Sequence, residues 1–189
     1  MASPRDYKNT IIPNWCPGCG DYGIQNAISA VCAKKGWANE DITLISGIGC
    51  SSRIGGYQYC YGAHTTHGRA LPFAQGIKCA NKDTHMIVCS GDGDSYAIGL
   101  GHAMHAMKRN MDITYLVFDN QVYGLTKGQT SPASSQGFVT KTTPDGNPMT
   151  PLDAPSMAIA AGATFVAQAY AIDGKNLGDI IEKAVDHKG

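Results

Sequence analysis

Short apolar runs alternate with helical patterns along this chain, and three of the runs end in glycine and polar residues. The run at 42–46 is followed by Gly-Ile-Gly-Cys, the run at 86–90 by Gly-Asp-Gly, and the run at 113–118 by Asp-Asn. Strands separated by helices at this spacing are typical of a parallel sheet with helices on both faces. Right-handed crossovers bring the carboxyl ends of such strands to one edge, where ligands bind. We therefore expect an α/β fold with its functional site at that edge.

The remaining elements follow from apolar spacing and from helix start and stop signals. Helices are expected at 22–35, 72–80, 95–108, 156–161 and 177–187, and a further strand at 163–169. Gly99 and Gly101 weaken the third helix. A long polar loop is expected from 123 to about 151. We expect residues 1–189 to form one domain, with a cysteine-bearing N-terminal segment at 12–21.

The charge balance argues against nucleic acid as a partner. Lys and Arg number 15 and Asp and Glu number 15, so the formal net charge is zero, whereas nucleic-acid binding needs a basic face. The chain has no signal-peptide pattern and no apolar run of about 18 residues, so we expect no membrane span. Seven cysteines without a secretory signal argue against a disulfide scaffold and for the cytoplasm.

Asp92 and Asn120 are separated by one strand–helix–strand unit of about 30 residues, so both side chains are expected at the ends of neighbouring strands. Both are hard oxygen donors and suit Mg²⁺, which takes a few protein oxygens together with phosphate. Gly91 and Gly93 leave room for a phosphate, and a helix beginning near Ser95 would direct its N-terminal dipole at that anion. The set indicates a diphosphate held through a metal ion.

Two other interpretations of these glycines exist. A Gly-Asp-Gly sequence is a common turn, and Asp-Asn is another. A dinucleotide-binding turn needs a third glycine three residues later. That position is Tyr96 after Gly91 and Gly93, and Ser52 after Gly47 and Gly49. The interpretation as a dinucleotide-binding dehydrogenase therefore fails.

Cys16 and Cys19 form a C-x-x-C pair just before a helix. Such a pair binds zinc or an iron–sulfur cluster, or acts in redox chemistry. Zinc would need two further ligands, which His64 and His67 offer. A [4Fe–4S] cluster would instead recruit Cys50 and one more thiolate. Among the other cysteines, Cys60 stays open, and three are expected in the core because apolar residues flank them: Cys32, Cys79 and Cys89.

Taken together, the motifs resemble those of the β subunits of the 2-oxoacid:ferredoxin oxidoreductases, which bind thiamine diphosphate. The matching runs are W-C-P-G-C-G at 15–20, S-G-I-G-C-S at 46–51, H-G-R-A-L-P at 67–72, G-D-G-D-S at 91–95 and D-N-Q-V-Y-G-L-T-K-G-Q at 119–129. They occur in the family's order between residue 15 and about 132. The resemblance implies the thiamine diphosphate-binding fold.

The resemblance also implies site residues. Mg²⁺ would be bound by Asp92, Asn120 and the backbone carbonyl of Val122, and a [4Fe–4S] cluster by Cys16, Cys19 and Cys50. Contacts to thiamine diphosphate are implied at Ile48, Gly49, Cys50, Ser51, His67, Gly91, Gly93, Asp94, Gly124 and Leu125.

The implied activity is the coenzyme A-dependent oxidative decarboxylation of 2-oxoglutarate, or a related 2-oxoacid, to acyl-CoA and CO₂. Electrons would leave through the cluster to ferredoxin. An α subunit would supply the activating Glu and the Arg that binds the 2-oxoacid carboxylate, in a hetero-oligomer expected to be a dimer of αβ pairs, so this chain alone should be inactive. Lys127 would pair with the distal carboxylate of the substrate, the alternative being a solvated loop lysine.

Two other functions remain open at this point. A non-redox thiamine diphosphate-dependent decarboxylase or ligase would keep the oxygen donors and need no cysteine triad. A zinc-stabilised structural subunit would keep the cysteine pair and the two histidines. In the family the fourth cluster cysteine follows the last strand, and no cysteine stands there before Gly189. We therefore expect a sequence truncated at its C-terminus, with Cys60 or a partner group as the alternative fourth ligand.

Overall fold

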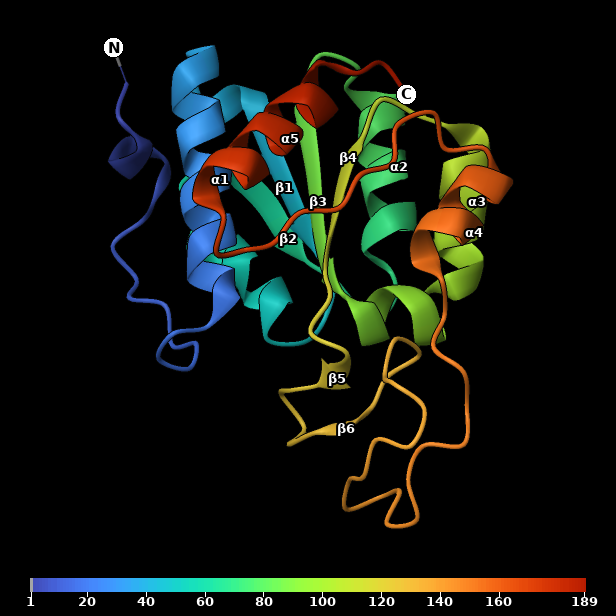
Figure 1. Cartoon of the computed structure of the whole chain (residues 1–189). Helices are drawn as coiled ribbons and strands as arrows, with labels where there is room; N and C mark the ends of the chain where they lie inside the picture. The colour runs from blue at the N-terminus through green and yellow to red at the C-terminus, as the bar shows by residue number, and fades with distance from the viewer. Residues whose placement is uncertain (1) are drawn as a thin grey trace.

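A computed structural model describes residues 2–189 and has a parallel sheet at its centre (Figure 1). The four strands lie in the order β2–β1–β3–β4, and every neighbouring pair is parallel. Their bounds are β1 (Ile42–Ser46), β2 (Tyr61–His64), β3 (His85–Gly91) and β4 (Thr114–Phe118). The expected α/β class with a parallel sheet is therefore confirmed.

Helices cover both faces of this sheet. Helices α1 and α5 pack on one face, and α2 and α3 on the other, with α4 beside α3 (Figure 1). Their bounds are α1 (Gly20–Lys35), α2 (Ala70–Ala80), α3 (Leu100–Arg109), α4 (Ala154–Ala161) and α5 (Gly174–Asp186). Shorter turns are η1 (Pro4–Tyr7), η2 (Asn39–Asp41), η3 (Ser51–Gly56) and the π-helical η4 (Asp94–Ile98). No helix among residues 2–189 is long and apolar enough to cross a bilayer.

The central strands are apolar without interruption because both of their faces are covered. Every residue of β1 is buried. Leu44 and Ile87 point toward α1 and α5, whereas Ile45 and Val88 point toward α2. The sheet is therefore held from both sides, and its carboxyl edge forms a fixed platform for the loops that follow.

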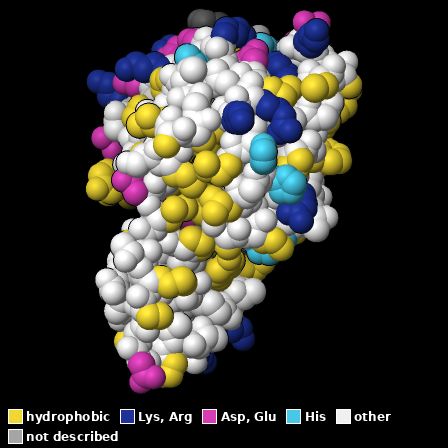
Figure 2. Space-filling model, turned by 90° about the vertical axis from the view of Figure 1, so that its right-hand side faces the viewer, with side chains coloured by type: hydrophobic (Ala, Val, Ile, Leu, Met, Phe, Trp, Pro, Cys, Tyr) yellow, Lys and Arg dark blue, Asp and Glu magenta, His cyan; other side chains and the backbone are white. Residues whose placement is uncertain are grey.

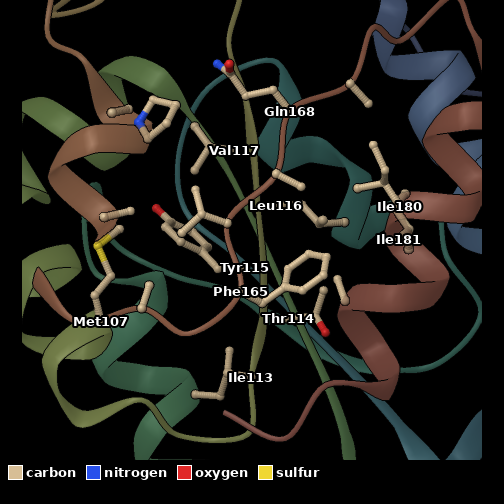
Figure 3. Close-up of a pocket in the computed structure, with 18 of the residues that line it drawn as sticks. Met107, Ile113, Thr114, Tyr115, Leu116, Val117, Phe165, Gln168, Ile180 and Ile181 are labelled. Atoms are coloured by element: carbon tan, nitrogen blue, oxygen red, sulfur yellow. The ribbon is translucent and has the colours of Figure 1, made fainter. Parts of the chain in front are cut away.

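The strand expected at 163–169 is wrong. This segment is extended, but it forms no ladder, and β4 pairs with β3 alone. A cavity of about 550 Å³ separates the segment from β4, lined on one side by Leu116 and Val117 and on the other by Phe165 and α5 (Figure 3). The apolar run alone does not decide whether a segment pairs with a sheet, and this segment joins no described strand.

Two short strand pairings were missed. The edge strand β2 lies in a stretch rich in Gly and Tyr, where the sequence predicts no strand, and three of its four residues are exposed. Strands β5 (Val122–Tyr123) and β6 (Gln129–Thr130) form a small antiparallel hairpin at the start of the expected long loop. Both lack the apolar alternation that marks a half-buried strand.

The helix expected at 95–108 is divided into η4 and α3, and Gly99 marks the junction. A Cβ at Gly99 would lie 2.4 Å from the backbone oxygen of Asp94, whereas a Cβ at Gly101 would meet nothing within 4 Å. Gly68 packs against the same junction, because a Cβ there would lie 2.7 Å from the nitrogen of Gly99. Of the two helix glycines, Gly99 is thus required by packing and Gly101 is not.

We predict opposite effects for the two substitutions Gly99→Ala and Gly101→Ala. The first should lower the free energy of unfolding by about 1–3 kcal/mol, since backbone atoms must move to admit the methyl group. The second should raise it by about 0.5–1 kcal/mol, as expected for Ala in an open helical position. Urea titration followed by circular dichroism measures both, and equal effects would contradict the structural difference between the two glycines.

Candidate functional site

The carboxyl ends of the strands meet at the lower edge of the sheet in Figure 1, above the β5–β6 hairpin. Gly91 at the end of β3 is in register with Phe118 at the end of β4. Asp92 and Asp119 therefore leave adjacent strands at the same level. The large cavity beside β4 is lined by none of the site residues expected from the sequence, so the candidate site is a surface of loops at this edge.

Asp92 is a carboxylate withdrawn from water. Its residue is 2% exposed, and Ser131 donates its hydroxyl to Oδ2. Burial raises the pKa of Asp92, the Ser131 hydrogen bond lowers it, and the charge of Asp119 raises it again. An anion buried in this way is stabilised by a cation. No sequence motif pointed to Ser131, which lies 39 positions away in a loop.

Asn120 begins a loop with unusual backbone geometry. Its Oδ1 accepts a hydrogen bond of 3.2 Å from the backbone nitrogen of Val122, and Gln121 between them has a φ of 59°. Residues other than glycine rarely adopt positive φ, and such conformations cluster at functional sites. The backbone oxygen of Gln121 is held by the hydroxyl of Ser134 at 2.5 Å.

Gly124 brings this loop against a cysteine. A Cβ at Gly124 would lie 3.5 Å from Nδ2 of Asn120 and 3.6 Å from Sγ of Cys50. The side chains of Asn120 and Cys50 therefore flank one point, although they follow different strands. Sulfur and oxygen donors expected from separate motifs share one edge of the molecule.

Gly91 and Gly93 lie close to other side chains of the protein. A Cβ at Gly93 would lie 2.3 Å from the ring of Tyr123, whose hydroxyl donates to the backbone oxygen of Gly93 at 3.2 Å. A Cβ at Gly91 would lie 3.1 Å from the hydroxyl oxygen of Ser51. Side-chain atoms of Tyr123 and Ser51 therefore lie where a Cβ at these glycines would have to be.

Asp94 joins three loops at this edge. Its Oδ1 accepts hydrogen bonds from Nδ1 of His67 at 2.5 Å, from the backbone nitrogen of Ile48 at 3.1 Å and from that of Gly68 at 2.7 Å. Its Oδ2 is buried without a partner and lies against Gly47, where a Cβ would be 1.7 Å away. Asp94 therefore holds the end of β1 and the start of α2 to the turn after β3.

The three cysteines of the expected cluster lie near one another. Burial raises the pKa of Cys50, and the nearby side chains of Asp21 and Cys16 raise it further. Burial also raises the pKa of Cys19, and the charges of Asp21 and Cys16 raise it further. The indole nitrogen of Trp15 donates to the backbone oxygen of Cys50 at 2.6 Å, so the N-terminal segment is fixed to the loop after β1.

The zinc interpretation finds no support in this arrangement. His64 contacts Ser46 at 3.1 Å, and His67 contacts Asp94, so neither histidine is directed at the cysteine pair. Within residues 2–189, no three His, Cys, Asp or Glu side chains converge on a single metal ion. An iron–sulfur cluster has no such requirement, because each cysteine ligates a different iron atom.

The other cysteines are divided between core and surface. Cys32 and Cys89 are buried as expected, but the prediction for Cys79 is wrong, because it lies exposed near the end of α2. Cys60 packs against the same core cluster as Cys32. Burial raises the pKa of Cys60 to about 11, which disfavours the thiolate that a metal ligand must supply.

Lys127 and Leu125 lie in the exposed turn between β5 and β6. Lys127 has a φ of 79°, and its backbone nitrogen donates to the oxygen of Gly124 at 3.1 Å. Lys127 therefore has a positive φ, which is uncommon for a residue other than glycine, in the exposed turn that follows the Asn120 loop.

Comparison with known proteins identifies the family of this chain. Residues 47–189 match the family model of the thiamine pyrophosphate enzyme C-terminal TPP binding domain. The 2-oxoglutarate synthase subunit KorB of Archaeoglobus fulgidus is 44% identical over 190 residues, which cover 100% of this chain and 71% of that protein. The chain belongs to the β subunits of the 2-oxoacid:ferredoxin oxidoreductases.

Other β subunits of this family are equally similar. The 2-oxoglutarate oxidoreductase subunit KorB of Mycobacterium tuberculosis is 45% identical over 98% of this chain and 50% of its own length. The 2-oxoacid:ferredoxin oxidoreductase subunit beta of Saccharolobus solfataricus is 47% identical over 93% of this chain and 58% of its own length. The chain thus spans 50–58% of these two relatives.

A solved structure of the family has the same fold. It is the 2-oxoglutarate:ferredoxin oxidoreductase from Magnetococcus marinus with 2-oxoglutarate, coenzyme A and succinyl-CoA bound, at a TM-score of 0.98 and 42% identity. The match covers 100% of this chain and 65% of that chain. The thiamine diphosphate-binding fold of this β-subunit chain is therefore confirmed.

We predict that the cysteines of this chain, when it carries no iron–sulfur cluster, are alkylated at different rates. Iodoacetamide at a pH of about 8 should alkylate the exposed Cys16 and Cys79 before Cys19 and Cys50, because raised pKa values leave fewer thiolates at the latter two. A higher pH should reduce this difference. Peptide mass spectrometry measures the modification at each site, and rapid alkylation of the buried Cys89 without denaturant would contradict the prediction.

Proposed function

We propose that this chain is the thiamine diphosphate-binding part of the β subunit of a 2-oxoglutarate:ferredoxin oxidoreductase. With an α subunit and coenzyme A, it would convert 2-oxoglutarate to succinyl-CoA and CO₂ and pass two electrons, one at a time, to ferredoxin. The observation that carries the proposal is the approach of Cys50 and Asn120 to the same point at Gly124. A redox centre and a metal-bound cofactor at neighbouring positions are what this reaction needs.

The donor set suits Mg²⁺. Asp92, Asn120 and the backbone carbonyl of Val122 are hard oxygen ligands, and Mg²⁺ takes few of these when phosphate oxygens complete its octahedron. The burial that raises the pKa of Asp92 favours a divalent cation beside it. This chain's part is to hold one carboxylate, one amide and one carbonyl on two adjacent loops.

Thiamine diphosphate supplies the electron sink that makes loss of CO₂ from a 2-oxoacid possible, and the protein supplies position and electrostatics. The loops at the carboxyl edge of the sheet are proposed to contact thiamine diphosphate. Asp94 fixes His67 through Nδ1, which leaves Nε2 for a ligand, and it fixes Ile48 through its backbone nitrogen. The remaining proposed contacts lie on the same loops: Gly49, Cys50, Ser51, Gly91, Gly93, Gly124 and Leu125.

The cysteine triad is the proposed site of a [4Fe–4S] cluster. Cys16 and Cys19 come from the N-terminal segment at 12–21, and Cys50 from the loop after β1. Iron offsets the negative charge that these thiolates would otherwise place beside Asp21, because metal binding stabilises the deprotonated form of a cysteine. Electrons would then leave the reaction site through sulfur ligands adjacent to the metal loop.

An exposed apolar surface favours a partner subunit. Figure 2 shows hydrophobic side chains gathered on the face that carries α3 and α4. Ile98 and Ile159 from this part of the chain are 55% and 64% exposed. Contiguous apolar surface of this kind marks protein–protein interfaces. We propose the α subunit as the partner, and it would also supply the Glu and Arg that the family's reaction requires.

Cofactor analysis of the αβ complex tests the proposal. Complex purified without oxygen should contain iron, acid-labile sulfide, Mg²⁺ and thiamine diphosphate. Cys50→Ser should remove the visible absorption of the cluster, since one iron loses its ligand. Asp92→Asn should remove most of the thiamine diphosphate and leave that absorption in place. A colourless wild-type complex that contains zinc would overturn the proposal.

Lys127 is the proposed contact to the distal carboxylate of 2-oxoglutarate. We predict that Lys127→Ala raises the KM for 2-oxoglutarate about tenfold or more, because a charge-assisted hydrogen bond contributes about 1.5–3 kcal/mol. The KM for pyruvate, which has no second carboxylate, should change less than about twofold. Lys141→Ala, at another exposed loop lysine, is the matched control. Equal changes for both substrates would refute this role.

A further inference from the structure

A chain of buried polar side chains leads from the Gly-Asp-Gly turn into the long loop after β6. Its members come from distant parts of the sequence and are nearly inaccessible to water. Asp92 and Ser131 are each 2% exposed, Ser134 is 0% and Asn147 is 3% exposed. Burying this many polar groups costs free energy unless each is hydrogen-bonded.

The hydrogen bonds of this chain are continuous. Ser131 donates its hydroxyl to Oδ2 of Asp92 and accepts from the backbone nitrogen of Ala133 at 3.2 Å. Ser134 accepts from the backbone nitrogen of Ser131 at 2.8 Å and donates to the backbone oxygen of Gln121 at 2.5 Å. Nδ2 of Asn147 donates to the backbone oxygen of Ser134 at 3.1 Å.

The two serines act on both sides of the proposed metal-ligand set. Ser131 fixes one oxygen of the Asp92 carboxylate. Ser134 fixes the peptide group that joins Gln121 to Val122, next to the positive φ of Gln121. A single turn at 131–134 therefore orients ligands that leave two different strands. Asn147, at the far end of the loop, holds the 131–134 turn through its hydrogen bond to the backbone oxygen of Ser134.

We propose that the loop at 131–147 is a positioning element for the metal site, with Ser131, Ser134 and Asn147 as positioning residues. The inference rests on the proposed function, since the metal is the Mg²⁺ of that site. Partners that orient metal ligands raise metal affinity, and their loss typically costs about 10–100-fold. The serine hydroxyls do this here without touching the metal, because their protons are directed at Asp92 and at Gln121.

The coupling is reciprocal. If an ordered loop improves the binding of Mg²⁺ and thiamine diphosphate, their binding must stabilise the ordered loop by the same free energy. Lys141 lies exposed in this loop and provides a site for trypsin. Protection of Lys141 therefore reports the order of the loop independently of activity.

The experiment compares variants of the αβ complex in two measurements. Isothermal titration gives the affinity for Mg²⁺ with thiamine diphosphate present, and mass spectrometry gives the rate of tryptic cleavage after Lys141. We expect Ser131→Ala to weaken Mg²⁺ binding about 10–100-fold and to abolish the protection that Mg²⁺ and thiamine diphosphate give to Lys141. Ser135→Ala, one residue past the turn and exposed, should behave as wild type.

Asn147→Ala guards against a simple folding defect at Asp92, because it changes the loop without removing a bond to either serine hydroxyl. It should weaken Mg²⁺ binding several-fold and speed the cleavage at Lys141. Wild-type Mg²⁺ affinity in both Ser131→Ala and Asn147→Ala would overturn the inference while leaving the proposed function intact. A wild-type complex that binds no Mg²⁺ with thiamine diphosphate would instead overturn the proposed function.

Discussion

The burial of Asp92 is the constraint on which the rest of the site depends. A carboxylate that is 2% exposed keeps its charge only if hydrogen bonds or a cation replace the lost water. The parallel sheet sets the problem, because β3 delivers Asp92 to an edge where β4 delivers Asp119 and Asn120 beside it. The hydroxyl of Ser131 replaces part of the lost hydration of Asp92 with a hydrogen bond, and a divalent cation would replace the rest. The fold therefore buries a carboxylate at the edge where the proposed metal ligands lie.

A second buried carboxylate, Asp94, has a different task. It accepts hydrogen bonds from His67 and from the backbone nitrogens of Ile48 and Gly68. Asp94 therefore holds these loops together and fixes the imidazole of His67. Gly47 and Gly99 make this possible, since side chains there would meet Asp94 itself. Asp92 and Asp94, separated by a single glycine, thus have different roles. Asp92 is a proposed metal ligand, whereas Asp94 holds neighbouring loops together.

The sequence predicted the framework well and the tertiary polar contacts poorly. β1 was expected at its observed bounds because an uninterrupted apolar run between a helix and a Gly-rich turn has few other structures available. The segment 163–169 shows the limit of that signal, since apolar residues favour extended chain but do not decide whether a neighbour lies within hydrogen-bonding distance. Asp92 and Asn120 were predicted as metal ligands from motif spacing, and the structure places Asp92 and the Asp119–Asn120 turn at the ends of adjacent strands. Ser131 was not predicted, because a serine in a polar loop carries no local sign of a buried partner 39 positions away.

The N-terminal segment brings the cysteine motif to the edge that carries the strand-end motif. Trp15 is buried, with its ring edge-on to Tyr22 and Tyr57, and its indole nitrogen is bound to the backbone of Cys50. An aromatic ring packed in this way fixes the residue after it, so Cys16 is carried to the loop after β1 although the two cysteines are far apart in sequence. Because Cys50 also flanks Gly124 opposite Asn120, the same residue links the sulfur donors to the oxygen donors. A loss of packing at Trp15 would therefore separate the two sets of donors without altering either motif.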